Sequence, residues 1–324
     1  MSVPETSLGF AEIADPYRGE LLAHCYRMMG SVHDAEDLVQ ETLLRAWRGY
    51  DRFDGRSSLR TWLYRIATNA CLTALQSRQR RALPSGLGAP DEAGTLDLER
   101  AETVPWISPL RTAPPDGADP AQIATIREGT RLALIAALQH LPARQRAVLL
   151  LVEVVGFDVP EAARFLDVSY PAARSLLQRA RATLKDAAPS ADAAARPLPP
   201  LEREADVLAK YLAAFEAADT AALALLLRED AIYEMPPMAQ WFRGHAAILH
   251  HHEVRVWSRR RHAVATWANG HPAIATYVGS GPGPLAFHAI QVLEISEDLI
   301  GRIVVFLDPT LADAFGVPHE LAAP

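Results

Sequence analysis

Residues 34–76 have the sequence DAEDLVQETLLRAWRGYDRFDGRSSLRTWLYRIATNACLTALQ, which predicts two amphipathic helices joined by a turn-rich connection. Apolar residues recur at helical spacing in each half and predict one buried face per helix. The first face comprises Ala35, Leu38, Val39, Thr42 and Ala46, and the second comprises Leu59, Trp62, Leu63, Ile66, Ala67 and Ala70. These two helices predict a small all-α domain.

The first of these helices also carries an acidic stripe. Asp34, Asp37 and Glu41 share a face away from the apolar one. Ser31 precedes Asp34 by three residues, which is typical of a helix start, and early carboxylates suit the helix dipole. We therefore predict an acidic exposed surface here.

The charge changes sign in the second half of the stretch. Between Arg45 and Arg81 there are nine arginines and two aspartates. Four aromatic residues lie among them, namely Tyr50, Phe53, Trp62 and Tyr64. Arginine interleaved with aromatic rings suits phosphate binding and stacking on unpaired bases. The alternative is that the arginines are only solvated and that Trp62 belongs to the buried face.

The length and charge distribution indicate several domains. The chain has 324 residues and a net charge of -7, and this length accommodates two or three domains. The net charge is +1 over residues 1–81, -5 over 82–121, +3 over 122–187 and -6 over 188–324. An acidic total therefore does not exclude DNA binding by the basic parts.

The remaining global features favour a cytoplasmic protein. The two cysteines, Cys25 and Cys71, fall in apolar helical patterns, as buried free thiols do in a reducing compartment. The N-terminal residues lack a basic start with an apolar core, and the longest apolar runs are too short to cross a bilayer. No membrane partner is expected.

Residues 122–187 predict a second helical domain that contains a helix-turn-helix. A short helix ends at Leu166, and a longer helix follows a turn capped by Ser169. The polar side chains of the longer helix suit base readout in a major groove. The candidate contacts are Ser169, Tyr170, Arg174, Ser175, Gln178, Arg179, Arg181 and Lys185. The alternative is the polar face of an ordinary bundle helix.

The C-terminal part predicts an α+β domain, with helices first and an antiparallel curved sheet after them. Asn269-Gly270 is a hairpin signal between two predicted strands. Aromatic and polar residues of this domain are candidates for lining a conical pocket, with a hydrophobic core as the alternative. They are Tyr233, Met235, Trp241, Trp267, Tyr277, His288, Phe306 and Asp308.

Neither a metal site nor a cofactor is expected. His250, His251 and His252 are consecutive, so on a helix they point in different directions, which disfavours a shared metal ion. Nor does the sequence contain a convincing acid/base constellation, so no catalytic residue is assigned. Residues 104–110, VPWISPL, place Trp106 in a linker, and we predict that it docks onto a neighbouring domain.

The sequences DAEDLVQETLLRAW (34–47) and YDRFDGRSSLRTWLYRIATNACL (50–72) resemble region 2 of bacterial sigma-70-family RNA polymerase sigma factors of the extracytoplasmic-function (ECF) group. The resemblance implies that the acidic helix binds core RNA polymerase and that the following loop and helix open and read the minus-10 promoter element. The implied polymerase contacts are Asp34, Asp37, Leu38, Glu41, Leu44 and Trp47. The implied minus-10 contacts are Phe53, Arg56, Ser57, Ser58, Arg60, Thr61, Tyr64 and Arg65.

Two further segments extend the resemblance. Residues 159–185 resemble region 4 of the same family, which reads the minus-35 element, although Asp158-Val159-Pro160 replaces the usual Ser- or Thr-led helix start. Residues 230–249, DAIYEMPPMAQWFRGHAAIL, are similar to the SnoaL-like group of the nuclear-transport-factor-two-like cone fold. That group includes both enzymes and non-catalytic ligand-binding domains, so the fold does not decide between them.

These observations predict a multidomain protein with two all-α sigma domains and one α+β cone domain. The predicted boundaries are 11–82 for region 2, 83–121 for an acidic Pro/Gly-rich linker, 122–187 for region 4, 188–202 for a second linker and 203–317 for the SnoaL-like domain. The predicted function is promoter-specific transcription initiation, without catalysis, modulated by the C-terminal domain. The alternatives are a ligand-gated DNA-binding regulator and a DNA-binding segment fused to an enzyme. Neither the promoter sequence nor an anti-sigma partner follows from the sequence.

Overall fold

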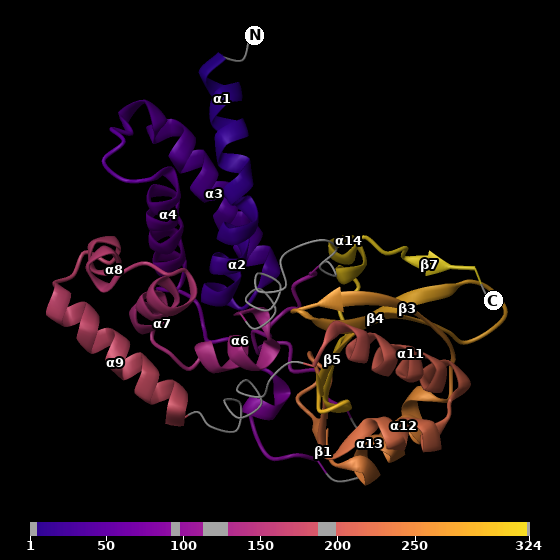
Figure 1. The fold of residues 1–324 in the computed structure, drawn as a ribbon. Helices are drawn as coiled ribbons and strands as arrows, with labels where there is room; N and C mark the ends of the chain where they lie inside the picture. The colour runs from indigo at the N-terminus through magenta and orange to yellow at the C-terminus, as the bar shows by residue number, and fades with distance from the viewer. Residues whose placement is uncertain (1–4, 92–97, 113–128, 187–198, 323–324) are drawn as a thin grey trace. The chain divides into compact units, whose positions relative to one another are not determined.

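The computed structural model describes residues 5–91, 98–112, 129–186 and 199–322. The chain divides into two compact units, one formed by residues 1–81 and 133–193 and the other by residues 82–132 and 194–324. Figure 1 shows the first as helical and the second as built around a sheet. Most of the predicted second linker, 188–202, and the first residues of the predicted second helical domain, 122–128, lie outside the described residues. No helix in the described ranges is both long and apolar enough to cross a membrane.

The N-terminal part of the helical unit is a bundle in which α3 and α4 begin at serine caps. The side chain of Ser31 caps α3 by accepting the amide of Asp34, and Ser58 caps α4 by accepting the amide of Thr61. The apolar faces of α2, α3 and α4 meet in a closed core. The bounds are α1 Glu5–Ala14, α2 Arg18–Met29, α3 Val32–Gly49 and α4 Leu59–Ala74, with 3-10 turns at Asp15–Tyr17 and Tyr50–Arg52.

Both cysteines lie in this core as free thiols, as predicted. A hydrogen bond with the Cys25 thiol, together with burial, raises the pKa of the Cys71 thiol. The two thiols are therefore neighbours, and the Cys71 thiol is held in its protonated form.

The second helical part contains the predicted helix-turn-helix. Asp158 caps α8 in a reciprocal capping box with Glu161, so the unusual Asp158-Val159-Pro160 start is a regular helix start. Pro142 precedes α7, and a π-turn extends that helix to Val154. The bounds are α6 Leu132–Leu138, α7 Ala143–Leu149, the π-turn Leu150–Val154, α8 Val159–Phe165 and α9 Tyr170–Asp186.

The second unit contains a curved sheet with strand order β2-β1-β6-β5-β4-β3, and β7 pairs with β5. Strands β1 and β6 are parallel, and the other pairs are antiparallel. The short strands β2 and β7 were not predicted. The strands are β1 Leu227–Glu234, β2 Trp241–Arg243, β3 Arg260–Ala268, β4 His271–Gly279, β5 Leu285–Ser296, β6 Leu299–Phe306 and β7 Glu320–Leu321. The helices are α11 Leu201–Ala217, α12 Thr220–Leu226, α13 His245–His251 with a π-turn His252–Val256, and α14 Leu311–Phe315.

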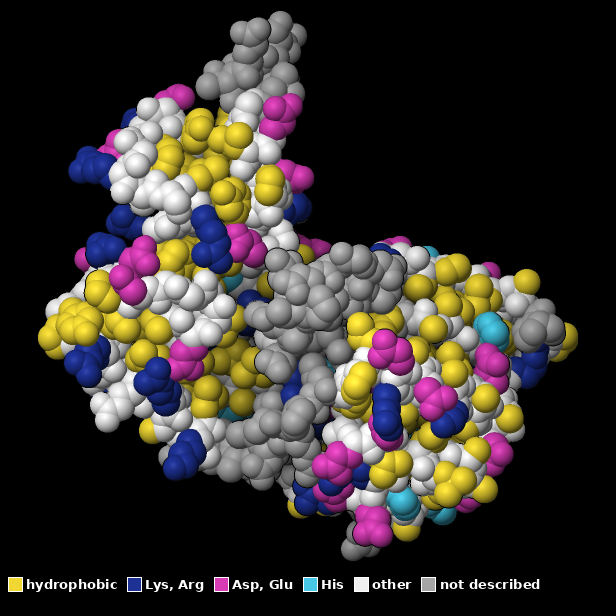
Figure 2. All heavy atoms as spheres, in the orientation of Figure 1, with side chains coloured by type: hydrophobic (Ala, Val, Ile, Leu, Met, Phe, Trp, Pro, Cys, Tyr) yellow, Lys and Arg dark blue, Asp and Glu magenta, His cyan; other side chains and the backbone are white. Residues whose placement is uncertain are grey.

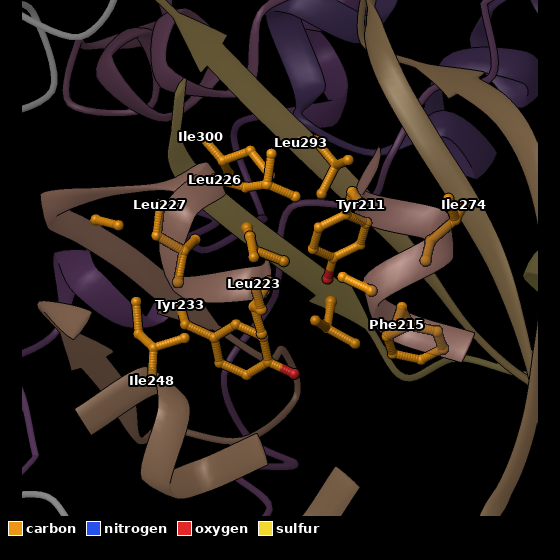
Figure 3. Packing of buried hydrophobic residues seen from close by; sticks show 14 of the residues in the cluster. Tyr211, Phe215, Leu223, Leu226, Leu227, Tyr233, Ile248, Ile274, Leu293 and Ile300 are labelled. Carbon is orange, nitrogen blue, oxygen red and sulfur yellow. The ribbon is translucent and has the colours of Figure 1, made fainter. Parts of the chain in front are cut away.

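One face of this sheet packs on the helices and forms the core of the domain. Figure 3 shows Tyr211 and Phe215 of α11 and Leu223 of α12 beside Ile274 and Leu293 of the sheet. Because strand side chains alternate between faces, the neighbours of these residues lie on the opposite face, which we call the outer face. The outer face carries Glu234, Val292, Arg302 and Val304, according to the strand register.

The linker after region 2 belongs to the same unit as the sheet. Its first part contains a 3-10 turn, Pro84–Gly86, whose Ser85 amide donates to Glu234 Oε2 at 3.0 Å. Farther along, backbone bonds join Glu99 to Ala239, and Leu110 to Asn269. The acidic, Pro/Gly-rich composition predicted a flexible tether, whereas the described parts of this linker are bonded to the C-terminal domain.

Candidate nucleic-acid interface

The acidic stripe of α3 divides into a structural end and an exposed end. The Asp34 side chain is only 14% exposed and forms ion pairs with Arg78 and, at 2.7 Å, with Arg81. Burial opposes ionisation of the Asp34 carboxyl, but hydrogen bonds from both arginines lower its pKa below the usual value. Leu38 is buried in the core. These two predicted polymerase contacts therefore stabilise the bundle.

The other predicted polymerase contacts lie on an open surface. Asp37 and Glu41 are exposed, and Glu41 pairs with Arg45 at 2.5 Å on the same helix. Leu44 and Trp47 are each 44% exposed, which is unusual for large apolar side chains. An apolar patch beside carboxylates is typical of a protein-binding surface.

The loop before α4 presents polar groups above an aromatic stack. The Phe53 ring lies between the rings of Tyr50, at 6.2 Å, and Trp62, at 4.9 Å. Arg56 and Ser57 are exposed, and Arg56 Nε pairs with Asp54 at 2.5 Å. Ser58 and Thr61 are instead joined by a hydrogen bond of 2.8 Å between their hydroxyls, so they form the helix cap. Phe53, Arg56, Ser57 and Ser58 thus lie within one loop, and Thr61 lies in the first turn of α4.

Two predicted minus-10 contacts do not lie on an open face. Tyr64 is 2% exposed, its hydroxyl donates to Glu20 at 3.1 Å, and its ring meets that of Phe157 edge-on at 5.4 Å. The Arg60 guanidinium lies over the rings of Tyr64 and Phe157, pairs with Glu20 at 2.9 Å and reaches the Val155 carbonyl. Burial, followed by the negative charge of Glu20, raises the pKa of Tyr64. Arg65, by contrast, is exposed.

Phe157 belongs to the turn before α8, so region 4 contacts region 2 at Arg60 and Tyr64. A second contact lies at Arg146 of α7, which is buried and donates to the carbonyls of Met28, Gln139 and Leu141. Burial lowers the pKa of Arg146 to about 10. Arg146 thereby satisfies a carbonyl at the C-terminal end of α2. The sequence did not indicate this role, since Arg146 only precedes an apolar run.

Every predicted minus-35 contact on or beside α9 is exposed. Ser169 caps the helix by accepting the Ala172 amide at 3.4 Å, and the Arg174 guanidinium lies 5.9 Å from the centre of the Tyr170 ring. Figure 2 shows Lys and Arg side chains along this helix, at the lower left. The helix borders a hollow of about 680 Å³ lined by Val152, Val159, Pro171, Arg174, Ser175, Leu177, Gln178 and Arg181.

Arg181 marks the edge of that hollow. Its guanidinium pairs with Glu153 at 2.6 Å, yet 61% of its side chain remains exposed. Such an exposed pair contributes little to stability, so the arginine is readily exchanged from the carboxylate to a phosphate. The hollow thus combines apolar side chains such as Val152 and Leu177 with the exposed polar side chains of Arg174 and Gln178. Polar groups of this kind can contact base edges and phosphates.

The predicted pocket residues of the C-terminal domain are divided between the faces of its sheet, which corrects their assignment to one lining. Tyr233 and Met235 belong to the core. Trp241 pairs with Glu234 on the outer face, and its indole donates to the Gly88 carbonyl of the linker at 3.2 Å. Strand alternation separates these side chains.

The other predicted pocket residues differ in their surroundings. The Tyr277 hydroxyl donates to the Pro318 carbonyl at 2.9 Å, and the Asp308 carboxylate accepts the Thr310 amide at 3.0 Å. Burial, followed by the charge of Arg259, lowers the pKa of His288. Phe306 is buried, and the Trp267 carbonyl accepts the Thr112 amide.

Two interior polar groups, Tyr211 and His252, lie on the helix side of the sheet, and sequence reasoning did not name Tyr211. The Tyr211 hydroxyl donates to Gln291 Oε1 at 2.8 Å, and His252 Nδ1 lies 2.8 Å from the Ile248 carbonyl. Burial is the main cause that lowers the pKa of His252 to about 4. Among the described residues, no three His, Cys, Asp or Glu side chains gather as a metal-binding group.

The outer face carries a buried charged cluster. Arg302 lies between Glu234, at 2.9 Å, and Glu294, at 3.4 Å, and all three side chains are at most 8% exposed. Burial opposes the charge of Arg302, but the two carboxylates raise its pKa. Because Glu234 also accepts the Ser85 amide, this cluster fixes the start of the linker.

Comparisons with known proteins agree with this architecture. The families Sigma-70 region 2, Sigma-70 region 4 and SnoaL-like domain match residues 13–81, 131–184 and 208–306. The ECF RNA polymerase sigma factor SigG of Mycobacterium tuberculosis is 50% identical over 316 residues, which cover 96% of this chain and 85% of the relative. The ECF RNA polymerase sigma factor SigW of Bacillus subtilis is 44% identical over 70 residues, 22% of this chain and 37% of its own.

A solved structure supports the fold over nearly the whole chain. The crystal structure of the extracytoplasmic function sigma factor SigJ of M. tuberculosis has a TM-score of 0.64 and 20% sequence identity. The alignment covers 95% of this chain and 99% of SigJ. The chain has two sigma regions, a SnoaL-like domain and a relative that is 50% identical over 96% of its length. It therefore belongs to the ECF group of sigma-70 factors, which are non-enzymatic proteins that direct transcription initiation by RNA polymerase.

Proposed function

We propose that α9 reads the minus-35 element and the Phe53–Ser58 loop with α4 opens and reads the minus-10 element. The observation that carries the proposal is the exposed polar face of α9 beside its hollow. Arg174 and Gln178 have the donors and acceptors for bidentate pairing with base edges. Ser169, Arg179 and Lys185 contact phosphates at either side.

The minus-10 element is opened at the Phe53–Ser58 loop. Flipping a base out of the stack costs a few kcal/mol, so the loop needs both a receiving surface and anchoring charges. The aromatic stack around Phe53 supplies a rigid wall, and the exposed Arg56 and Arg65 supply positive charge. Arg60 and Tyr64 join this surface only after Phe157 has left them.

Core RNA polymerase binds the exposed end of α3. Asp37, Glu41, Leu44 and Trp47 combine carboxylates with accessible apolar area on one helix. Burial of the two apolar side chains in an interface contributes the affinity, and the carboxylates give orientation. Asp34 and Leu38 act indirectly, because they hold α3 on its bundle.

The C-terminal SnoaL-like domain modulates this activity by binding the linker between regions 2 and 4. Support comes from the linker bonds at both ends of the sheet, namely Ser85 to Glu234 and Leu110 to Asn269. A linker held on a domain cannot extend freely, so the domain controls when regions 2 and 4 can separate. A small-molecule ligand in this domain would act by strengthening or weakening the bonds between the domain and the linker.

A run-off transcription assay with core RNA polymerase tests the proposal. Full-length protein should give a promoter-dependent transcript, and Trp47→Ala should reduce it through weaker polymerase binding. The matched control is Trp257→Phe, a change of a tryptophan that packs on Phe215 within the C-terminal domain. Truncation after Ala188 should change the transcription rate. An unchanged rate would refute modulation by the C-terminal domain but not the sigma activity.

A further inference from the structure

Three consecutive arginines lie at the start of β3 in the C-terminal domain. Arg259, Arg260 and Arg261, which we call the basic corner, follow the π-turn after α13. The net charge of residues 188–324 is -6, so the basic corner differs in sign from the domain as a whole. Exposed charges more than about 8 Å apart are largely screened at physiological salt, so a local cluster decides the field at its own surface.

Among the residues that the structure describes, no carboxylate pairs with the basic corner. The Arg260 guanidinium donates instead to the carbonyls of Gly281 and, at 3.4 Å, of Gly283 in the turn between β4 and β5. The Arg261 guanidinium donates to the Trp257 carbonyl at 2.7 Å, and its Cζ lies 4.8 Å from the centre of the Trp257 ring. Neutral carbonyls and an aromatic ring hold these guanidinium groups in place without cancelling their charge.

Arg259 is exposed and forms no hydrogen bond or ion pair within the described parts of the chain. Burial, followed by the charge of Arg259, lowers the pKa of His288, so this guanidinium lies close to β5. The carboxylate of Glu216 does reach the start of β3, but it pairs with His262 at 2.8 Å and accepts the Ala263 amide at 3.3 Å. The positive charge of Arg259 is therefore available to a partner.

Several other cations of the same domain are paired with carboxylates. Arg203 pairs with Asp298 in the turn between β5 and β6, and Lys210 pairs with Asp206 at 2.7 Å on α11. The β5–β6 turn lies at the end of β5 opposite to the β4–β5 turn that Arg260 contacts. These paired cations provide a control for the unpaired ones.

We infer that the basic corner binds the phosphate backbone of promoter DNA. This contact goes beyond the proposed function, which places no DNA contact in the C-terminal domain. An arginine has five N–H donors in a fork that matches a phosphate, and Arg260 uses only its Nη1 in the bonds to the turn. That turn, residues 280–284, contains only Ser, Gly and Pro, so it carries no charge that would repel a phosphate.

Duplex DNA suits the basic corner better than an acidic protein does. Regions 2 and 4 of a sigma factor bring the rest of the chain to promoter DNA, which raises the effective concentration of phosphates around it. The duplex carries one negative charge per about 1.7 Å of its axis, so neighbouring arginines can each reach a phosphate.

Phosphate contacts can be counted from the salt dependence of binding. Each neutralised phosphate contributes about 0.9 to the slope of log affinity against log salt concentration. Loss of the contacts of Arg259 and Arg260 should therefore reduce the slope by about 1.8. The fall in affinity between about 50 and 200 mM salt should then be about 12-fold smaller.

Glutamine substitutions test this expectation in the complex of the full-length chain with core RNA polymerase. Arg259→Gln removes one charge without breaking a hydrogen bond in the described structure, and it should reduce the slope for promoter binding by about 0.9. Arg259→Gln/Arg260→Gln should reduce the slope by about 1.8. The matched control, Arg203→Gln/Lys210→Gln, also removes two charges and should leave the slope unchanged. An unaltered slope in the first two variants, or an equal reduction in the control, would overturn the inference.

Photo-crosslinking in the same complex identifies the partner. Ser258 is exposed beside the basic corner, so a benzoylphenylalanine at this position should crosslink to promoter DNA. The same group in place of the exposed Arg203 should not. Crosslinks from position 258 to a polymerase subunit alone would overturn the inference and assign the basic corner to an acidic protein surface.

Discussion

Truncating Phe157 should release region 4 from the minus-10 surface of region 2. Phe157 is 8% exposed, and its ring contacts the Tyr64 ring at 5.4 Å and the Arg60 guanidinium at 5.3 Å. The aromatic pair contributes about 0.5–1.5 kcal/mol beyond its buried area, and the cation–π contact contributes about 0.5–1 kcal/mol. Phe157→Ala should therefore weaken the contact by about 2 kcal/mol, or roughly 30-fold in the closed-to-open equilibrium.

Distance measurements between spin labels test this expectation. Cysteines introduced at the exposed positions Arg48 and Lys185 report on the two regions, and the native cysteines are buried and resist labelling. The distance distribution should shift to longer values in Phe157→Ala. Phe53→Ala is the matched control, because the Phe53 ring stacks on Tyr50 and Trp62 within region 2.

Release of region 4 by Phe157→Ala should also affect the formation of open promoter complexes. Phe157→Ala should form open promoter complexes at lower concentrations of core RNA polymerase than the unaltered chain, because less free energy is spent on opening. Circular dichroism should show retained helix content, which separates opening from unfolding of region 4, since Phe157 also packs on Phe165 at 5.0 Å. An unchanged distance distribution, or the same shift in Phe53→Ala, would refute the reasoning.

Three further predictions concern DNA readout, capping and acid stability. Arg174→Ala should cost about 1–3 kcal/mol of binding to the minus-35 element in a polymerase complex; equal losses on scrambled DNA would contradict base readout. Asp158→Ala should destabilise region 4 by about 1 kcal/mol in thermal unfolding, whereas Asp158→Asn keeps the cap to Glu161. The ion pairs of Asp34 lower its pKa, so they stabilise the fold above pH 3.8 and are lost as the pH falls below it. Asp34→Asn should accordingly reduce stability at neutral pH and make its acid dependence shallower in pH-dependent unfolding; an unaltered pH profile would argue against this role.

Local patterns predicted the helices and their faces because the relevant interactions lie within a few residues. Ser31, Ser58 and Ser169 cap helices as their spacing indicates, and the exposed face of α9 follows from its periodicity. Leu44 and Trp47 of α3 were named only through the resemblance to sigma factors, because a local pattern would bury such apolar side chains, and both are 44% exposed.

Contacts between distant segments were not predictable from these patterns. The resemblance placed Tyr64 among the minus-10 contacts, but Phe157, from a distant part of the chain, covers its ring. The aromatic residues proposed for one pocket were assigned without the strand register, and that register divides Tyr233 from Trp241. Asn269 gave only a hairpin signal, because its bonds to Leu110 and Thr130 join segments more than a hundred residues apart.

Binding of the full-length chain to core RNA polymerase tests the central claim most directly. Titration of fluorescently labelled core polymerase should give saturable 1:1 binding that Trp47→Ala weakens and Trp257→Phe leaves unchanged. Absence of saturable binding, or equal weakening by both changes, would contradict the assignment of α3 as the polymerase-binding surface.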